Sequence, residues 1–272
     1  MNELPLLIFT LCLQGSVGIT LWLALGPKPG LSIQTRQLVF PVMATSFILA
    51  CIGLVASSLH MGYPLNALNA LRHVQSSWLS REIVFASLYL AMLGFSSLLI
   101  FLRKSGWKAF LLTAALLGLV DVFCMGQIYI HTSVITWLHI NTLVMFFGSV
   151  GIIGSVVLAN VYVRNSLFKA KTAMRIAGAV VIVVVLLRLI MQPVWVADIT
   201  AADASIVTLP HDPLAMLAQL RHVHLFSWCM SVFGMICFGI GTFRNARGMM
   251  LAGSVIVIIA EIMLRFVFFS IG

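Results

Sequence analysis

Histidine, arginine and carboxylate side chains gather in one short stretch of an otherwise apolar chain. Residues 58–83 read SLHMGYPLNALNALRHVQSSWLSREI and include His60 and Glu82. Oxidation of a hydroquinone releases two protons with two electrons, and an imidazole and a carboxylate that titrate near the working pH could each accept one proton. We therefore predict that His60 and Glu82 are proton acceptors. The alternative for Glu82 is structural, because an acid in the first turn of a helix capped by Ser80 is favoured by the helix dipole.

Other polar residues could line or tune the same site. We select six further candidates: Gln14, Arg72, His73, Arg81, Asp121 and Tyr129. Arg72, His73 and Arg81 could tune the proton acceptors or hold a docked partner. Asp121 lies past the middle of an apolar segment, where an ionisable group is costly and a functional role is the first hypothesis. Its alternative role is a hydrogen bond to a neighbouring helix.

Long apolar segments must position these groups. Of the 272 residues, 61% are hydrophobic and only 8% are charged, whereas soluble domains carry roughly 25% charged residues. Eight segments are long enough to cross a bilayer as helices: residues 4–26, 38–60, 81–102, 107–130, 136–162, 173–194, 215–243 and 248–270. Their apolar runs are continuous and lack the alternation of barrel strands. The sequence therefore predicts an all-α integral membrane protein with eight transmembrane helices in a single polytopic domain over residues 1–272.

Basic residues are distributed unequally between the connections. The odd-numbered connections hold Lys28, Arg36, Arg103, Lys104, Lys108, Arg164, Lys169, Lys171, Arg175, Arg244 and Arg247, whereas the even-numbered ones hold only Arg72 and Arg81. Because cytoplasmic loops are enriched in Lys and Arg, we expect the odd-numbered connections to face the cytoplasm of a bacterium. Both termini and residues 58–83 then lie on the periplasmic side of its inner membrane.

The charge and the cysteines exclude some kinds of partner and cofactor. The net charge of +9 belongs largely to short loops, where it orients the protein in the membrane, so we expect no nucleic-acid partner. Five cysteines lie inside apolar segments and form no CxxC pair. This pattern is not that of a zinc site or an iron–sulfur cluster, and we expect this protein to hold no metal.

The seven histidines raise the question of haem. Haem b in a helix bundle usually needs two inward histidines on facing helices at matched depth. The histidines at positions 131, 139, 222 and 224 instead lie near the outer ends of predicted spans. We therefore expect no haem, and a haem between His139 and His224 is the alternative.

Three charged residues lie in the last spans. Glu261 and Arg265 are four residues apart, a spacing that favours an ion pair within one helix. Arg188 is expected to reach outward to the membrane interface or to Asp198.

The polar stretch also contains motifs of a known family. His60-x-Gly62-x-Pro64 is followed by Asn69 and by LSREI, which contains Glu82, and the sequence begins with LPLLIFTLCLQGSVG after three residues, a segment that contains Gln14. These motifs resemble the membrane anchor subunit of bacterial dimethyl sulfoxide reductases, the DmsC type. The resemblance covers roughly the first 100 residues by motif, and the remainder by the number of spans.

The resemblance implies a role in anaerobic respiration. Members of this family lack haem and oxidise menaquinol to menaquinone near the periplasmic face. They pass the electrons to an extrinsic subunit with four iron–sulfur clusters, which serves a molybdopterin catalytic subunit. The protein would then be a non-catalytic component of a quinol:S- or N-oxide oxidoreductase. The quinol-site histidine and glutamate of the family match His60 and Glu82.

Three other functions stay open on the residues alone. One is a purely structural anchor without quinol chemistry, and another is a cytochrome b-type quinol oxidoreductase subunit with two haems. A transporter would place broken helices and charges at the membrane midplane, whereas the polar residues here gather at the outer edge.

Overall fold

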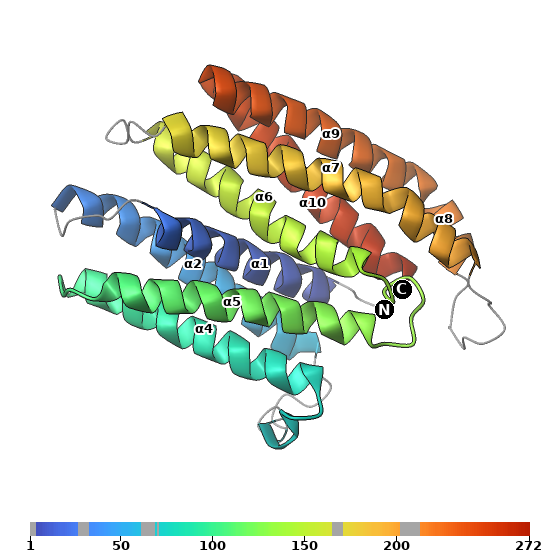
Figure 1. The fold of residues 1–272 in the computed structure, drawn as a ribbon, viewed down its shortest axis with the longest axis horizontal. Helices are drawn as coiled ribbons and strands as arrows, with labels where there is room; N and C mark the ends of the chain where they lie inside the picture. The colour runs from blue at the N-terminus through green and yellow to red at the C-terminus, as the bar shows by residue number, and fades with distance from the viewer. Residues whose placement is uncertain (1–3, 27–32, 61–68, 70, 165–170, 202–212) are drawn as a thin grey trace. The chain divides into compact units, whose positions relative to one another are not determined.

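The computed structural model describes residues 4–26, 33–60, 69, 71–164, 171–201 and 213–272 (Figure 1). These residues form helices joined by short turns. In sequence order the elements are α1 (Leu4–Leu25), α2 (Ile33–His60), the 3-10 helix η2 (Leu71–His73), α4 (Trp78–Phe101), α5 (Trp107–Ile130), α6 (Asn141–Arg164), α7 (Lys171–Ala201), α8 (Pro213–Gln219), α9 (Arg221–Arg244) and α10 (Arg247–Ile271).

Eight of these helices are long and apolar enough to cross a membrane. Their candidate spans contain 21 to 31 residues, and about 20 apolar residues suffice for a bilayer core. The predicted all-α membrane fold with eight spans is therefore confirmed.

The helix α4 begins earlier than the sequence suggested. It starts at Trp78 instead of residue 81, and its N-cap is Ser77, whose side chain accepts a hydrogen bond from the Ser80 amide at 3.4 Å. The prediction that Ser80 caps this helix is therefore wrong, because Ser80 already lies within the first turn and is buried.

Three other boundaries also differ from the prediction. The helix α6 begins at Asn141 instead of residue 136, after a run of turns. The helix α7 continues through Pro193 to Ala201, because a membrane helix tolerates proline where neighbouring groups satisfy the freed carbonyl. The segment predicted as one span over residues 215–243 is two helices, α8 and α9, that meet at Leu220.

The described residues divide into two compact units, residues 4–125 and residues 126–272, here called the N-terminal and C-terminal units. In the N-terminal unit α1 packs against α2 and α2 against α4. The helix α5 approaches both α1 and α4 at Gly118, where a Cβ atom would lie 2.7 Å from Val17 Cγ2 and 3.1 Å from Tyr89 Cδ2. A larger residue at position 118 would therefore push these helices apart.

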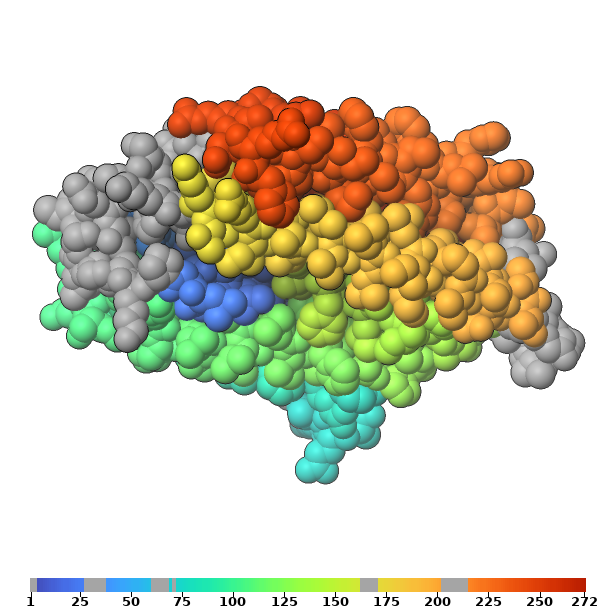
Figure 2. All heavy atoms as spheres, turned by 45° about the horizontal axis from the view of Figure 1, so that its top comes forward, coloured from blue at the N-terminus to red at the C-terminus, as the bar shows by residue number. Residues whose placement is uncertain are grey.

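In the C-terminal unit four long helices form a closed arrangement. The helix α6 contacts α7 and α10, and α9 contacts α7 and α10; α7 and α9 run along one another at the surface in Figure 2. The contact between α9 and α10 depends on glycines, since a Cβ atom on Gly253 would collide with the backbone nitrogen of Phe238. Small residues of this kind let membrane helices approach closely.

Candidate functional site

Three polar side chains from three helices are buried in the N-terminal unit. Gln14 of α1 and Asp121 of α5 are fully buried, and Glu82 of α4 is 5% exposed. Glu82 is the fifth residue of its helix, and Asp121 lies nine residues before the end of α5, so both are within about 14 Å of the same end of these helices at 1.5 Å per residue. Two acids and an amide inside a membrane unit are costly, which makes this group the first candidate for a site.

The two carboxyl groups interact with each other. Asp121 lies close enough to Glu82 for the two charges to repel when both are ionised. The ends of their helices are packed together, since the rings of Trp78 and Phe123 meet edge to face at 6.0 Å. Both carboxyl oxygens of Asp121 are buried and accept no hydrogen bond from any described residue. Since a buried carboxylate without a donor is strongly destabilising, this position requires a proton or a hydrogen-bond donor from outside the protein.

Gln14 lies beside the same part of α5. Its amide Nε2 is 3.3 Å from the sulfur of Met125, and Met125 is one helical turn beyond Asp121, on the same face of α5. The structure thus brings together Gln14, Glu82 and Asp121 of the predicted residues.

A polar cluster that the sequence analysis did not identify lies deeper in the N-terminal unit. The Tyr89 hydroxyl is 2.5 Å from Ser16 Oγ and 3.0 Å from Thr20 Oγ1, and Ser46 Oγ bonds to both of these α1 residues. Tyr89 is two turns beyond Glu82 on the same face of α4 and also interacts electrostatically with Asp121. The sequence signal that could have indicated this cluster is the four-residue spacing of Ser16 and Thr20 within an apolar span.

The side chain of Arg81 is directed to the turn before α4. Its Nε donates to the Val74 carbonyl at 2.9 Å, its second guanidinium nitrogen donates to the Gln75 carbonyl at 2.5 Å, and the group stacks over Trp78 at 4.2 Å. Arg81 therefore fastens residues 74 and 75 to the first turn of α4. Arg72 and His73 belong to η2, and their polar side chains are exposed at the surface.

The backbone of His60 ends α2, whereas its side chain and residues 61–68, which include Gly62 and Pro64, lie outside the described residues. The level of the His60 backbone along the helix bundle follows from the packing of α2 against α4. Phe47 packs against Gly94, where a Cβ atom would be 3.1 Å from the ring. His60 follows Phe47 by thirteen residues on α2, and Arg81 precedes Gly94 by thirteen residues on the antiparallel α4. Both therefore lie about 20 Å from the Phe47–Gly94 contact. The register therefore places the backbone of His60 level with the start of α4.

Tyr129 belongs to the C-terminal unit. Its ring packs edge to face against Trp137 at 5.1 Å and Phe146 at 5.4 Å, and it also contacts Phe269 at 5.6 Å. This aromatic cluster gives Tyr129 a packing role within that unit.

The C-terminal unit contains a second buried charged group, arranged differently from the prediction. Arg188 is fully buried and forms an ion pair with Glu261, and it donates to the Met145 carbonyl at 2.6 Å. The expectation that Arg188 reaches the interface or Asp198 is therefore wrong. A buried guanidinium must have carboxylate and carbonyl acceptors, and α10 and α6 supply both.

The charges of Arg265 and Glu261 interact, as their spacing within α10 predicts. Glu261 pairs with Arg188 across helices, while Arg265 donates to Ser149 Oγ at 2.9 Å and stacks over the Phe146 ring at 4.3 Å. Gly148 makes room for this group, since a Cβ atom there would lie 2.7 Å from the Arg188 guanidinium.

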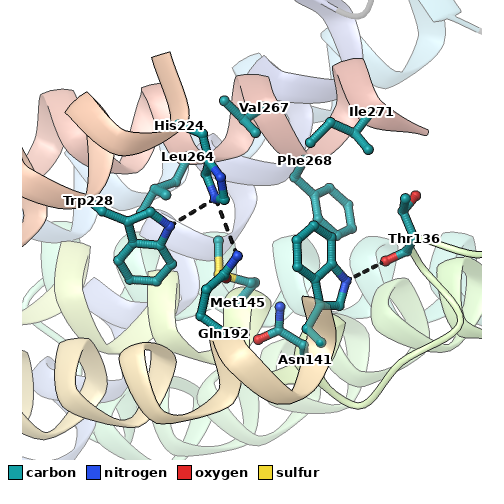
Figure 3. A pocket seen from close by; sticks show the side chains of 11 residues that line it. Thr136, Asn141, Met145, Gln192, His224, Trp228, Leu264, Val267, Phe268 and Ile271 are labelled. Atoms are coloured by element: carbon teal, nitrogen blue, oxygen red, sulfur yellow. Dashed lines mark hydrogen bonds between the residues drawn. The ribbon is translucent and has the colours of Figure 1, made fainter. Parts of the chain in front are cut away.

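Two histidines considered as haem ligands already have partners in the C-terminal unit. His139 Nε2 pairs with Asp198 at 3.0 Å, and His139 Nδ1 accepts from the Asn141 amide at 2.9 Å. His224 Nε2 accepts from Trp228 Nε1 at 2.9 Å (Figure 3). These contacts involve both ring nitrogens of His139 and Nε2 of His224. The pocket beside His224 has a volume of about 30 Å³, which is room for about two water molecules.

Comparisons with known proteins agree with the membrane fold. The family model for the DMSO reductase anchor subunit (DmsC) matches residues 1–271. The C subunit of the anaerobic dimethyl sulfoxide reductase of Haemophilus influenzae is 32% identical over 58% of this protein and 57% of its own length. The subunit of the same name from Escherichia coli is 35% identical over 54% of this protein and 53% of its own length.

A further relative from Escherichia coli, the anaerobic dimethyl sulfoxide reductase subunit YnfH, is 32% identical over 58% of this protein and 57% of its own length. The matches thus span a little more than half the length of these curated relatives. No solved structure matches the sequence. Because the family model extends over essentially all of the eight-span fold, the protein is a multi-pass membrane protein of the DMSO reductase anchor subunit (DmsC) family.

Proposed function

We propose that this protein anchors a molybdopterin oxidoreductase complex to the bacterial inner membrane and oxidises menaquinol in its N-terminal unit. The observation that carries the quinol site is the buried pair of Glu82 and Asp121, in which neither carboxyl oxygen of Asp121 has a donor among the described residues. A hydroquinone has two hydroxyl donors, and its oxidation needs acceptors for two protons.

The reaction balances within this site. Menaquinol loses two electrons and two protons and becomes menaquinone. His60 accepts one phenolic proton, and Glu82 accepts the other or passes it to the periplasm. Gln14 and Asp121 lie deeper and contact the ring side of the site. The level of the His60 backbone, close to the start of α4, supports this assignment.

The distribution of basic residues supports a periplasmic location for the site. Three Lys or Arg residues, Arg72, Arg81 and Arg221, lie in even-numbered connections or at the adjoining helix ends, whereas eleven lie in or beside odd-numbered ones, and cytoplasmic loops are the ones enriched in these residues. Both termini and the His60–Glu82 end of the N-terminal unit then face the periplasm.

The partners follow from the family. Its members are named as anchor subunits of DMSO reductase, and two of the relatives are named as the C subunit of anaerobic dimethyl sulfoxide reductase. These names support the proposal that the electrons leave for an extrinsic subunit with four iron–sulfur clusters, docked over the periplasmic ends of α2, α4 and α5, and then for a molybdopterin catalytic subunit. The anchor itself holds neither haem nor metal, in keeping with the other contacts of His139 and His224.

The test uses the whole complex with two electron donors. His60→Leu and Glu82→Gln should each lower menaquinol-driven reduction of an S-oxide by roughly 10²–10⁴-fold, the usual loss for a general base. Reduction driven by a dye that bypasses the quinol should persist. The control is Thr113→Ala, since the exposed Thr113 hydroxyl on α5 bonds to the Ala109 carbonyl of its own helix at 3.0 Å and lies outside the proposed site. Normal menaquinol turnover in both variants would favour a purely structural anchor.

A further inference from the structure

An apolar groove runs along the outer surface of the N-terminal unit between α2 and α4. It has a volume of about 500 Å³. On α4 its lining includes Ser87, Ala91, Gly94 and Leu98, and α2 contributes Phe47 and Leu54. The only hydroxyl among these residues, that of Ser87, is satisfied by the Ile83 carbonyl. The groove therefore presents hydrocarbon to a ligand.

The groove leads away from the proposed quinol site. Ser87 follows Glu82 by five residues on α4, and Leu54 precedes His60 by six residues on α2. From that level the lining continues along α4 to Leu98, a distance of about 16 Å at 1.5 Å per residue. One end thus lies one to two turns below the two proposed proton acceptors, and the other end approaches the opposite side of the membrane.

The shape of the groove comes from three small residues on one stripe of α4. Ser87, Ala91 and Gly94 recur at helical spacing, next to the buried stripe that holds Glu82 and Tyr89. Because Gly94 has no side chain, the Phe47 ring settles into the space beside it. Phe95 and Leu98 are 55% and 49% exposed and form an open edge toward lipid.

We propose that this groove holds the isoprenoid tail of the quinol while the ring reacts near Glu82, an assignment that rests on the proposed function. Lipid tails are as apolar as the groove, so occupancy gains little hydrophobic free energy. The role of the groove is steric, because it gives the tail a path into the bilayer that does not displace α2 or α4. A bulky side chain in the groove should therefore penalise tailed quinols and spare quinols without a tail.

The decisive variant is Ala91→Phe, assayed in the whole complex with a menaquinol that carries four isoprene units and with menadiol, the same ring without a tail. We expect kcat/KM for the tailed quinol to fall roughly tenfold, as for overpacking of a fitted site, while the value for menadiol stays within about twofold. Ala91→Leu should give a smaller loss of kcat/KM for the tailed quinol, and it replaces Ala91→Phe in the test if the complex with that larger substitution does not assemble. The matched control is Leu88→Phe, on the exposed surface of α4 outside the groove lining.

Three results would overturn the tail groove: equal values for Ala91→Phe and wild type with the tailed quinol, equal losses with both quinols, or the same selective loss in Leu88→Phe. Failure of the proposed function is measured separately. If Glu82→Gln and His60→Leu keep normal turnover with menadiol, the ring reacts elsewhere, whatever the outcome at position 91.

Discussion

Glu82 of α4 and Asp121 of α5 are both buried, and each lies within the electrostatic field of the other. They should therefore be energetically coupled. In a double-mutant cycle of Glu82→Gln and Asp121→Asn, we expect a coupling of roughly 0.5–3 kcal/mol in the free energy of unfolding in detergent. Removal of either carboxyl group should relieve the repulsion between them, so the second substitution should raise the free energy of unfolding by less than the first.

The control for this cycle pairs Glu82→Gln with Thr113→Ala. Thr113 is exposed on α5, bonds to the Ala109 carbonyl at 3.0 Å and is two turns from Asp121. Additive effects in both cycles, within about 0.5 kcal/mol, would show that the two carboxyl groups do not form one site.

The Tyr89 hydroxyl joins α4 to Ser16 and Thr20 of α1, which in turn bond to Ser46 of α2. Tyr89→Phe removes these hydrogen bonds and should lower the free energy of unfolding by about 1 kcal/mol, near the upper part of the range found for hydrogen bonds between membrane helices. Thermal unfolding of the detergent-solubilised protein measures the change. Ser87→Ala is the comparison, because it removes an exposed hydroxyl that bonds within its own helix; an equal loss in both variants would contradict a special role for Tyr89.

The ion pair of Arg188 and Glu261 is needed for the C-terminal unit to assemble. Glu261→Gln leaves the fully buried Arg188 without its carboxylate, and breaking a buried pair costs roughly 3–5 kcal/mol. We expect little of this variant in the membrane by immunoblot. Glu82→Gln is the matched control, since it neutralises a buried glutamate for which no ion pair is formed among the described residues, and it should accumulate normally.

Arg81 holds the turn before α4 through two carbonyl groups and the ring of Trp78. Arg81→Lys cannot reproduce two bonds from one planar group. We expect faster amide hydrogen exchange at residues 74–77 and a loss of menaquinol turnover smaller than that of Glu82→Gln. Unchanged exchange in this segment would show that the turn is held by other contacts.

The orientation of the protein in the membrane is testable at its last residue. A reporter that is active only in the periplasm, fused after Gly272, should give signal, because the excess of Lys and Arg lies in the odd-numbered connections. The paired measurement uses a reporter that is active only in the cytoplasm. Signal from the second fusion alone would reverse the orientation and place His60 and Glu82 at the cytoplasmic face.

The sequence by itself determined the class of fold. Continuous apolar runs of about 20 residues allow only helices that satisfy their own backbone groups in lipid, and the eight spans follow from that constraint. It also identified Glu82 as part of the polar stretch 58–83, and Asp121 as an isolated ionisable residue within an apolar run.

The tertiary structure alone decided which of these residues share a site. Glu82 and Asp121 are 39 positions apart in the sequence, and only the packing of α4 against α5 brings their charges together. The same holds for Arg188, which the sequence placed at the interface and the fold pairs with Glu261 on another helix. Helical periodicity shows which face of a helix carries a residue, but the rotation and register of neighbouring helices depend on contacts between side chains, such as those at Gly118 and Gly94.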